Sequence, residues 1–198
     1  MSCGCQNKSE TASTDVVIQT MEILAGQIKE TAEAVSRESI YDMLAVLLMA
    51  KEKGAAVFVA GAGRSGLMGR AFAMRLMHMG FRAYVVGDTV TPAVLSGDVL
   101  IAISGSGNTK SVVEIAEKCK KHGASVIAVT SKDGSELKEL KSVNVVLPVK
   151  SGDSTSKTPM GTSFEILALV FLDSVIMQLI ELMGITEAEM KARHANTE

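Results

Sequence analysis

The sequence predicts an α/β fold in which a five-stranded parallel sheet is covered by helices on both faces, as a three-layer α-β-α sandwich. Five short runs of apolar, mostly β-branched residues support this, at 57–60, 83–86, 99–103, 126–129 and 143–149. The runs are hydrophobic almost throughout, as in strands that are buried on both faces. Helical stretches such as 67–79 and 111–122 separate most of them, which is the alternation that a parallel sheet requires.

Two amphipathic helices are expected before the sheet. Apolar residues recur there with three- and four-residue spacing, at Val17, Met21, Leu24 and Ile28 and again at Ile40, Met43, Leu44, Leu47 and Leu48. Gly54 is expected to end the second helix.

Two further helices are expected after the sheet. The first is long, covers Thr162–Met183 and ends at Gly184, which suits a left-handed cap. Thr186 and Glu189 then have the spacing of a capping box, which predicts a short last helix.

Length and composition indicate one domain. At 198 residues and 47% hydrophobic content, the chain can bury one substantial core but is short for two ordinary domains. We expect a flexible polar tail over residues 1–13 and a single domain over residues 14–198, which includes the C-terminal helices.

Composition also argues against several classes of partner. A formal charge of -2 and the lack of Trp argue against nucleic-acid binding. The N-terminus lacks a signal pattern, and no apolar run is expected to reach the roughly 18 residues of a membrane span, so we expect a cytoplasmic protein without membrane contact. Cys3, Cys5 and Cys119 do not form a tetrahedral metal site, and no metal is expected.

The first candidate ligand loop is GAGRSG at residues 61–66, between the first strand and the next helix. Helix N-H groups and the helix dipole favour an anion there, and glycines allow close approach to the backbone. Arg64 and Ser65 are candidate ligands. The loop also matches the dinucleotide pattern G-x-G-x-x-G, with Asp88 at the distance of a ribose-binding acid, so a dinucleotide and an unliganded turn both stay open.

The second candidate loop is SGSGNT at residues 104–109, between the third strand and the next helix. It combines three hydroxyl groups and one amide, which can donate to phosphate oxygens without a cation. One helix cap needs one hydroxyl, so this loop favours a bound phosphate. A P-loop ending is missing, which argues against hydrolysis of nucleoside triphosphates.

Four separated motifs occur in an order that is typical of one known family. They are GAGRSG at 61–66, SGSGNT at 104–109, PMGTSFE at 159–165 and RHAN at 193–196. From about Thr14 to the C-terminus the sequence resembles the 6-phospho-3-hexuloisomerase family of the sugar isomerase (SIS) domain superfamily. It departs from that family in two places: only residues 150–158 stand where members often carry a longer insertion, and Asn108 replaces a frequent Glu.

The resemblance implies an activity and an assembly. The activity is the interconversion of D-arabino-hex-3-ulose 6-phosphate and fructose 6-phosphate, without a metal or an organic cofactor. The assembly is a homo-oligomer, as a tetramer, and the pathway partner is 3-hexulose-6-phosphate synthase. The expected substrate ligands are Arg64, Ser65, Ser104, Gly105, Ser106, Gly107, Asn108 and Thr109.

Moving a carbonyl group to the neighbouring carbon requires a base that removes a carbon-bound proton. Glu165 is the candidate base, although Thr162 and Glu165 also have capping-box spacing, so a capping role stays open. Among the three histidines, His194 is the candidate for proton transfer or ring opening, whereas His78 and His122 suit structural roles.

Three functions therefore compete: a ketohexose-phosphate isomerase, a non-catalytic sugar-phosphate sensor and a dinucleotide-dependent oxidoreductase. Isomerases of other sugar phosphates share the loop features, and only the resemblance separates them from the first function.

Overall fold

A computed structural model describes residues 11–149 and 161–197 of the chain. In these ranges seven helices and five strands follow one another along the chain. They are α1 (Thr11–Ala34), α2 (Arg37–Glu52), β1 (Ala56–Gly61), α3 (Gly63–His78), β2 (Arg82–Val85), β3 (Val99–Ile103), α4 (Lys110–Lys121), β4 (Ser125–Thr130), α5 (Glu136–Leu140), β5 (Val143–Val146), α6 (Thr162–Met183) and α7 (Glu187–Ala192).

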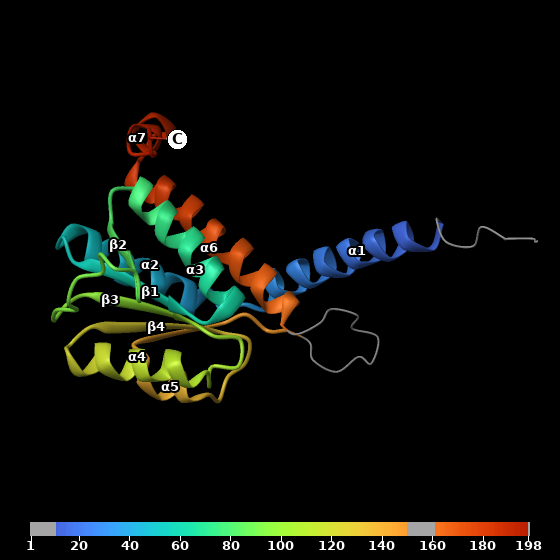
Figure 1. Ribbon diagram of the computed structural model, residues 1–198, viewed down its shortest axis with the longest axis horizontal. Helices are drawn as coiled ribbons and strands as arrows, with labels where there is room; N and C mark the ends of the chain where they lie inside the picture. Colours follow the sequence, from blue (N-terminus) through green and yellow to red (C-terminus); the bar gives the residue numbers. More distant parts are fainter. Residues whose placement is uncertain (1–10, 150–160, 198) are drawn as a thin grey trace, which may run out of the picture.

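The five strands form one parallel sheet, as predicted (Figure 1). Their order in the sheet is β2-β1-β3-β4-β5. The chain passes from β1 to β2 on one side and places β3 on the other side of β1. The strand order therefore reverses between β1 and β3, and in open α/β sheets ligands bind at the carboxyl ends of the strands at such a point. Residues 1–10, most of the expected tail, lie outside the described residues.

The sheet separates two apolar cores. Val57, Val59 and Ile101 face the core that α2, α3 and α6 cover, whereas Phe58 and Leu100 face the smaller core under α4 and α5. This alternation along each strand buries both faces of the sheet, and the three-layer sandwich is confirmed.

Several helix ends follow the sequence signals. Gly54 and Gly184 adopt the left-handed backbone conformation just after α2 and at the end of α6. The Thr186–Glu189 capping box at the start of α7 is present with both of its reciprocal hydrogen bonds.

Other element boundaries differ from the sequence prediction. The fifth strand ends at Val146 instead of residue 149, and the second strand begins one residue early, at Arg82. Helix α3 begins at Gly63, so that Arg64 and Ser65 belong to its first turn and not to a preceding loop. Helix α5 was missed, because five residues are too few to show a helical period.

An 18-residue stretch of helix α6 has a mean hydropathy of 2.1, and the helix meets the length and composition criteria for crossing a membrane. Asp173 and Gln178 interrupt the apolar residues of this helix, so the sequence does not show a continuous apolar run of that length. Core residues such as Leu172 and Leu179 bury one side of α6 inside the fold, as in long core helices of soluble proteins. Only 33% of the most apolar 18-residue stretch of α6 is buried, so apolar side chains of this helix also lie on the surface of the chain.

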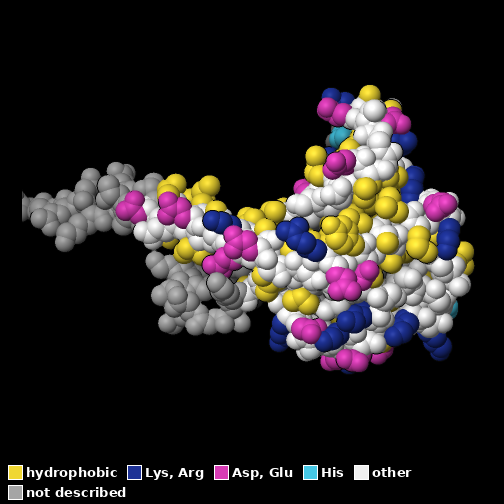
Figure 2. Space-filling model, turned by 180° about the vertical axis from the view of Figure 1, so that it is seen from behind, with side chains coloured by type: hydrophobic (Ala, Val, Ile, Leu, Met, Phe, Trp, Pro, Cys, Tyr) yellow, Lys and Arg dark blue, Asp and Glu magenta, His cyan; other side chains and the backbone are white. Residues whose placement is uncertain are grey.

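Helix α1 extends away from the body of the molecule (Figure 1). Its outer half exposes Val16, Val17, Ile18 and Met21, and hydrophobic side chains are visible on this arm and on the adjoining body in Figure 2.

Candidate active site

The two candidate loops leave neighbouring strands at the same level of the sheet. Gly61 at the end of β1 pairs in register with Ile103 at the end of β3. The loop that follows β1 leads directly into α3, and the loop that follows β3 leads into α4. Neither helix has a side-chain hydrogen bond at its N-cap. The backbone N-H groups in the first turns of α3 and α4 are therefore not capped by the N-cap side chain.

The glycines of the first loop permit a very close approach of α3 to β1. A Cβ atom on Gly66 would lie 2.6 Å from the carbonyl oxygen of Gly61, and one on Gly61 would lie 2.9 Å from the amide nitrogen of Gly66. The packing of this strand-to-helix turn thus requires glycine at both positions, whatever the loop binds.

The second loop divides its hydroxyl groups between two tasks. Ser104 is buried; its Oγ lies 2.8 Å from Oγ1 of Thr109 and accepts a hydrogen bond from the N-H of Gly107 at 3.1 Å. Ser106 is exposed, and its Oγ accepts from the N-H of Asn108 at 3.2 Å, which leaves the hydroxyl hydrogen free to donate. Ser104 therefore shapes the loop, whereas Ser106 can reach a ligand.

Hydrogen bonds and close packing with neighbouring segments fix the conformation of the second loop. Oδ1 of Asn108 accepts from the N-H of Glu136 at 2.8 Å, and the hydroxyl of Ser131 donates to the carbonyl of Gly105 at 2.6 Å. The backbone of Gly107 has a positive φ and packs so tightly that a Cβ atom would lie 2.2 Å from Oγ of Ser135. Sequence reasoning missed Ser131 and Ser135, because no local pattern relates them to a loop more than twenty residues earlier.

Glu165 lies in the first turn of α6, and its side chain binds Arg64. Nε of Arg64 donates to Oε2 of the carboxylate, and the two groups form an ion pair. The capping-box interpretation of Glu165 is wrong: the N-cap residue is Gly161, with a left-handed backbone and without a side-chain hydrogen bond, and Thr162 is already helical. The carboxylate is thus committed to Arg64 and not to the backbone of its own helix.

The start of α6 also contacts the second loop. The ring of Phe164 packs on Gly105, where an added Cβ atom would lie 3.0 Å from it. The N-terminal ends of α3, α4 and α6 therefore meet at the strand-order reversal. Three converging helix N-termini, with serine hydroxyls beside them, suit a bound anion.

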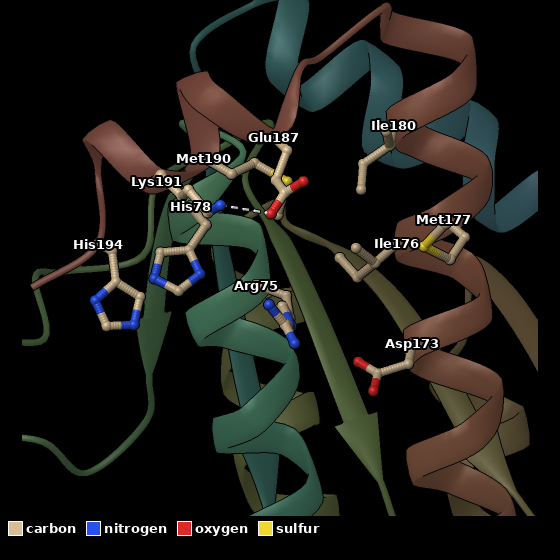
Figure 3. A pocket seen from close by; sticks show the side chains of 10 residues that line it. All are labelled: Arg75, His78, Asp173, Ile176, Met177, Ile180, Glu187, Met190, Lys191 and His194. Atoms are coloured by element: carbon tan, nitrogen blue, oxygen red, sulfur yellow. Dashed lines mark ion pairs between the residues drawn. The ribbon is translucent and has the colours of Figure 1, made fainter.

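His194 lies at the other end of α3. Its ring is exposed and stacks on His78, the last residue of α3, at 5.1 Å between centroids (Figure 3). Arg64 is the second residue of α3, and fourteen helical steps of about 1.5 Å separate it from His78 by about 21 Å. Within one chain, His194 and Glu165 are therefore not brought together.

The last helix is anchored at this far end. Nη1 of Arg193 donates to the carbonyl oxygens of His78 and Glu189, at 3.2 and 3.0 Å. A cavity of about 580 Å³ lies between α3, α6 and α7 (Figure 3). Burial, the neighbouring His194 and Arg75 together lower the pKa of His78 below its ordinary value.

Asp88 is engaged elsewhere. Its carboxylate accepts from both terminal nitrogens of Arg70, at 2.7 and 3.2 Å. Because both carboxylate oxygens of Asp88 already bind Arg70, they are not free to accept from a ribose hydroxyl group. The pairing therefore argues against a dinucleotide at the glycine loop.

Comparison with known proteins supports the sugar-phosphate interpretation. The SIS domain family model matches residues 34–170. A 3-hexulose-6-phosphate isomerase of Bacillus subtilis is 40% identical over an alignment of 180 residues that covers 88% of this chain and 95% of that protein. One from Methanocaldococcus jannaschii is 44% identical over 144 residues, 73% of this chain and 78% of the relative.

A solved structure agrees with these relatives. It is the crystal structure of a Methanococcus jannaschii protein, from which a function as 3-hexulose-6-phosphate isomerase was inferred; it covers 91% of this chain and 99% of its own, at 36% identity and a TM-score of 0.81. The resemblance noted in the sequence is confirmed, and the chain belongs to the SIS domain family.

Proposed function

We propose that this protein is an isomerase that interconverts D-arabino-hex-3-ulose 6-phosphate and fructose 6-phosphate. One observation carries the proposal: in a homologue of 3-hexulose-6-phosphate isomerases, a nearly buried carboxylate, Glu165, lies beside the hydroxyl loop at the strand-order reversal.

The chemistry assigned to Glu165 is a proton transfer between neighbouring carbons. Starting from fructose 6-phosphate, the carboxylate removes the proton on C3, and the electron pair moves onto the C2 carbonyl to form an enediolate. Return of the proton to C2, with transfer of a hydroxyl proton from O3 to O2, gives the 3-keto sugar. Atoms and charge balance without a redox partner, and neither a metal nor an organic cofactor enters the proposal.

The phosphate group is assigned to the converging helix N-termini. Ser65, Ser106 and Thr109 would donate hydroxyl hydrogens, with backbone N-H groups of the loops around Gly105 and Gly107. Asn108 and Ser104 support this loop from within, through Glu136 and Thr109. This division of tasks refines the expectation that all loop residues contact the ligand.

A homotetramer is proposed as the assembly. Apolar side chains on the arm of α1 and on the outer face of α6, such as Met21 and Met177, are 62% and 65% exposed in the single chain. Such surface is usually covered by another subunit. If His194 takes part in proton transfer or ring opening, it would serve the site of another subunit, because its own Glu165 lies at the opposite end of α3.

The broader context is also a proposal. We place the protein in the cytoplasm, without nucleic-acid or membrane partners, as a single SIS domain over residues 14–198 that acts after 3-hexulose-6-phosphate synthase. Removal of formaldehyde and supply of pentose phosphates are both compatible with this step. A sugar-phosphate sensor on the same fold is the second candidate, because the phosphate loop alone would serve it.

The test is conversion of the substrate. Fructose 6-phosphate labelled with carbon-13 at C2 is incubated with purified protein and EDTA, without nucleotide, and followed by carbon NMR. We expect the C2 signals of the hemiketal and keto forms of fructose 6-phosphate to decline as the signal of a labelled hydroxyl-bearing carbon appears, because C2 carries a hydroxyl group in the 3-keto sugar. Tight binding without conversion would identify a sensor, and loss of activity that a divalent ion restores would contradict the metal-free chemistry.

A further inference from the structure

Glu165 is a carboxylate that is largely withdrawn from water. The residue is 8% exposed and belongs to the buried residues of α6, as do Phe164 and Ala168. Placing a charged group there is unfavourable unless a partner compensates it. The structure supplies that partner in Nε of Arg64.

The two side chains of this ion pair differ in their exposure to water. The side chain of Arg64 is 61% exposed and could be hydrated without Glu165, whereas the side chain of Glu165 is 10% exposed. The pair engages one carboxylate oxygen, Oε2, and leaves the second oxygen outside the contact. A contact of this kind fixes the orientation of the carboxylate and keeps one oxygen available for a proton.

Substrate binding would increase the importance of this contact. The proposed phosphate loop touches the residue before Glu165, through Gly105 and Phe164. A phosphate held there adds negative charge near the carboxylate, and like charges repel more strongly in partly buried surroundings than in water. The guanidinium of Arg64 offsets that repulsion.

We propose that Arg64 is a positioning residue for Glu165 and not a phosphate ligand. It acts through the carboxylate, whose orientation and charge it stabilises while an anionic substrate is bound. The inference rests on the proposed function and reassigns Arg64, which the sequence predicts to be a substrate ligand.

The first test separates turnover from anion binding. In Arg64→Gln, kcat should fall by about a hundredfold, the usual worth of a general base, because the base loses its orientation. Two binding constants should change by less than about threefold: the KM for fructose 6-phosphate and the dissociation constant for inorganic phosphate, measured by calorimetry. The reason is that the serine and threonine hydroxyl groups of the proposed phosphate site remain. Arg64→Lys should retain part of the turnover, because lysine supplies the charge but not the planar donor group. Arg70→Gln removes an exposed ion pair from the same helix and is the matched control.

The second test asks whether Arg64 acts through Glu165. Arg64→Gln should cause no further loss of turnover when Glu165 is already Gln, because residues that act as a unit are not additive. Methylguanidinium should restore part of the turnover of Arg64→Ala, but none in the double variant Arg64→Ala/Glu165→Gln.

A tenfold or larger rise in the phosphate dissociation constant of Arg64→Gln, with kcat retained, would overturn the inference and make Arg64 a phosphate ligand. Additive losses in the double variant would also overturn it. Wild-type protein without any conversion of fructose 6-phosphate would instead refute the proposed function, and the phosphate calorimetry would still decide whether Arg64 binds the anion.

Discussion

The ring of Phe164 packs directly on Gly105, and this contact joins the start of α6 to the loop that follows β3. Glu165 is the next residue of α6, so the position of the proposed base depends on the lack of a side chain at residue 105. The fold thereby couples the geometry of the phosphate loop to that of the carboxylate.

Gly105→Ala tests this coupling. The added methyl group would lie 3.0 Å from the Phe164 ring, so the ring and the first turn of α6 must shift. Displacing a catalytic group by a fraction of an ångström to about 1 Å costs up to roughly a hundredfold in rate, so we expect turnover to fall by roughly tenfold to a hundredfold. Gly26→Ala in α1 is the control, since a Cβ atom there meets no atom within 4 Å and activity should not change. Unchanged turnover in Gly105→Ala would show that the contact does not position Glu165.

Ser106 and Ser104 should respond differently to the loss of a hydroxyl group. Ser106→Ala removes an exposed donor, and we expect substrate binding to weaken by about 1.5–3 kcal/mol without a change in stability. Ser104→Ala breaks buried hydrogen bonds to Thr109 and Gly107, and we expect the free energy of unfolding to fall by about 1 kcal/mol or more. Inhibition by inorganic phosphate and denaturant unfolding measure the two effects. Equal phosphate affinity in wild type and Ser106→Ala would remove Ser106 from the binding site.

The apolar arm of α1 should mediate assembly. Replacing both Val17 and Met21 by Glu places charges on a surface that we expect to be covered by another subunit. Light scattering should give the mass of four chains for wild type and a smaller mass for this variant. Gln19→Glu, at an exposed polar position of the same helix, should leave the mass unchanged. A wild-type monomer at micromolar concentration would contradict the tetramer and any role of His194 in a neighbouring site.

His78 should make the fold sensitive to acid. Burial, followed by the nearby His194 and Arg75, lowers its pKa, so the unfolded chain binds a proton at this position more readily than the folded one. Its contribution to stability is therefore complete above the ordinary imidazole pKa of roughly 6.5 and is lost as the pH falls towards the lowered folded value.

Denaturant unfolding at pH 7 and pH 5 measures this contribution. Wild type should lose more stability between the two values than His78→Gln does, because only wild type carries the imidazole with the lowered pKa at this position. Equal pH dependence in wild type and His78→Gln would show that protonation of His78 does not oppose folding.

Local patterns in the sequence predicted most of the fold. The β-branched runs identified all five strands, and the glycine at 184 and the Thr186–Glu189 spacing located helix ends correctly, because such signals act within a few residues. The two ligand loops could also be placed at neighbouring strand ends, since both follow buried strands.

Contacts between distant segments could not be predicted. Arg64 and Glu165 are 101 residues apart, and no local pattern distinguishes this ion pair from a capping box at Thr162. The position of His194 beside His78 depends on how α7 docks on the end of α3, through Arg193. Such contacts arise from three-dimensional packing, and the spacing of residues along the chain does not predict them.

Solvent-proton exchange at C3 of fructose 6-phosphate tests the central claim, that Glu165 transfers a carbon-bound proton, most directly. The sugar phosphate is incubated in deuterium oxide with wild type, with Glu165→Gln and with Glu181→Gln, an exposed position further along α6. Wild type and Glu181→Gln should incorporate deuterium at C3, and Glu165→Gln should do so at least about a hundredfold more slowly, because an amide cannot accept the proton. The free energy of unfolding of Glu165→Gln should differ from that of wild type by less than about 1 kcal/mol, because the amide oxygen can still accept a hydrogen bond from the exposed Arg64. Exchange at the wild-type rate in Glu165→Gln would contradict the account and assign the base to another group, with His194 of a neighbouring subunit as the next candidate.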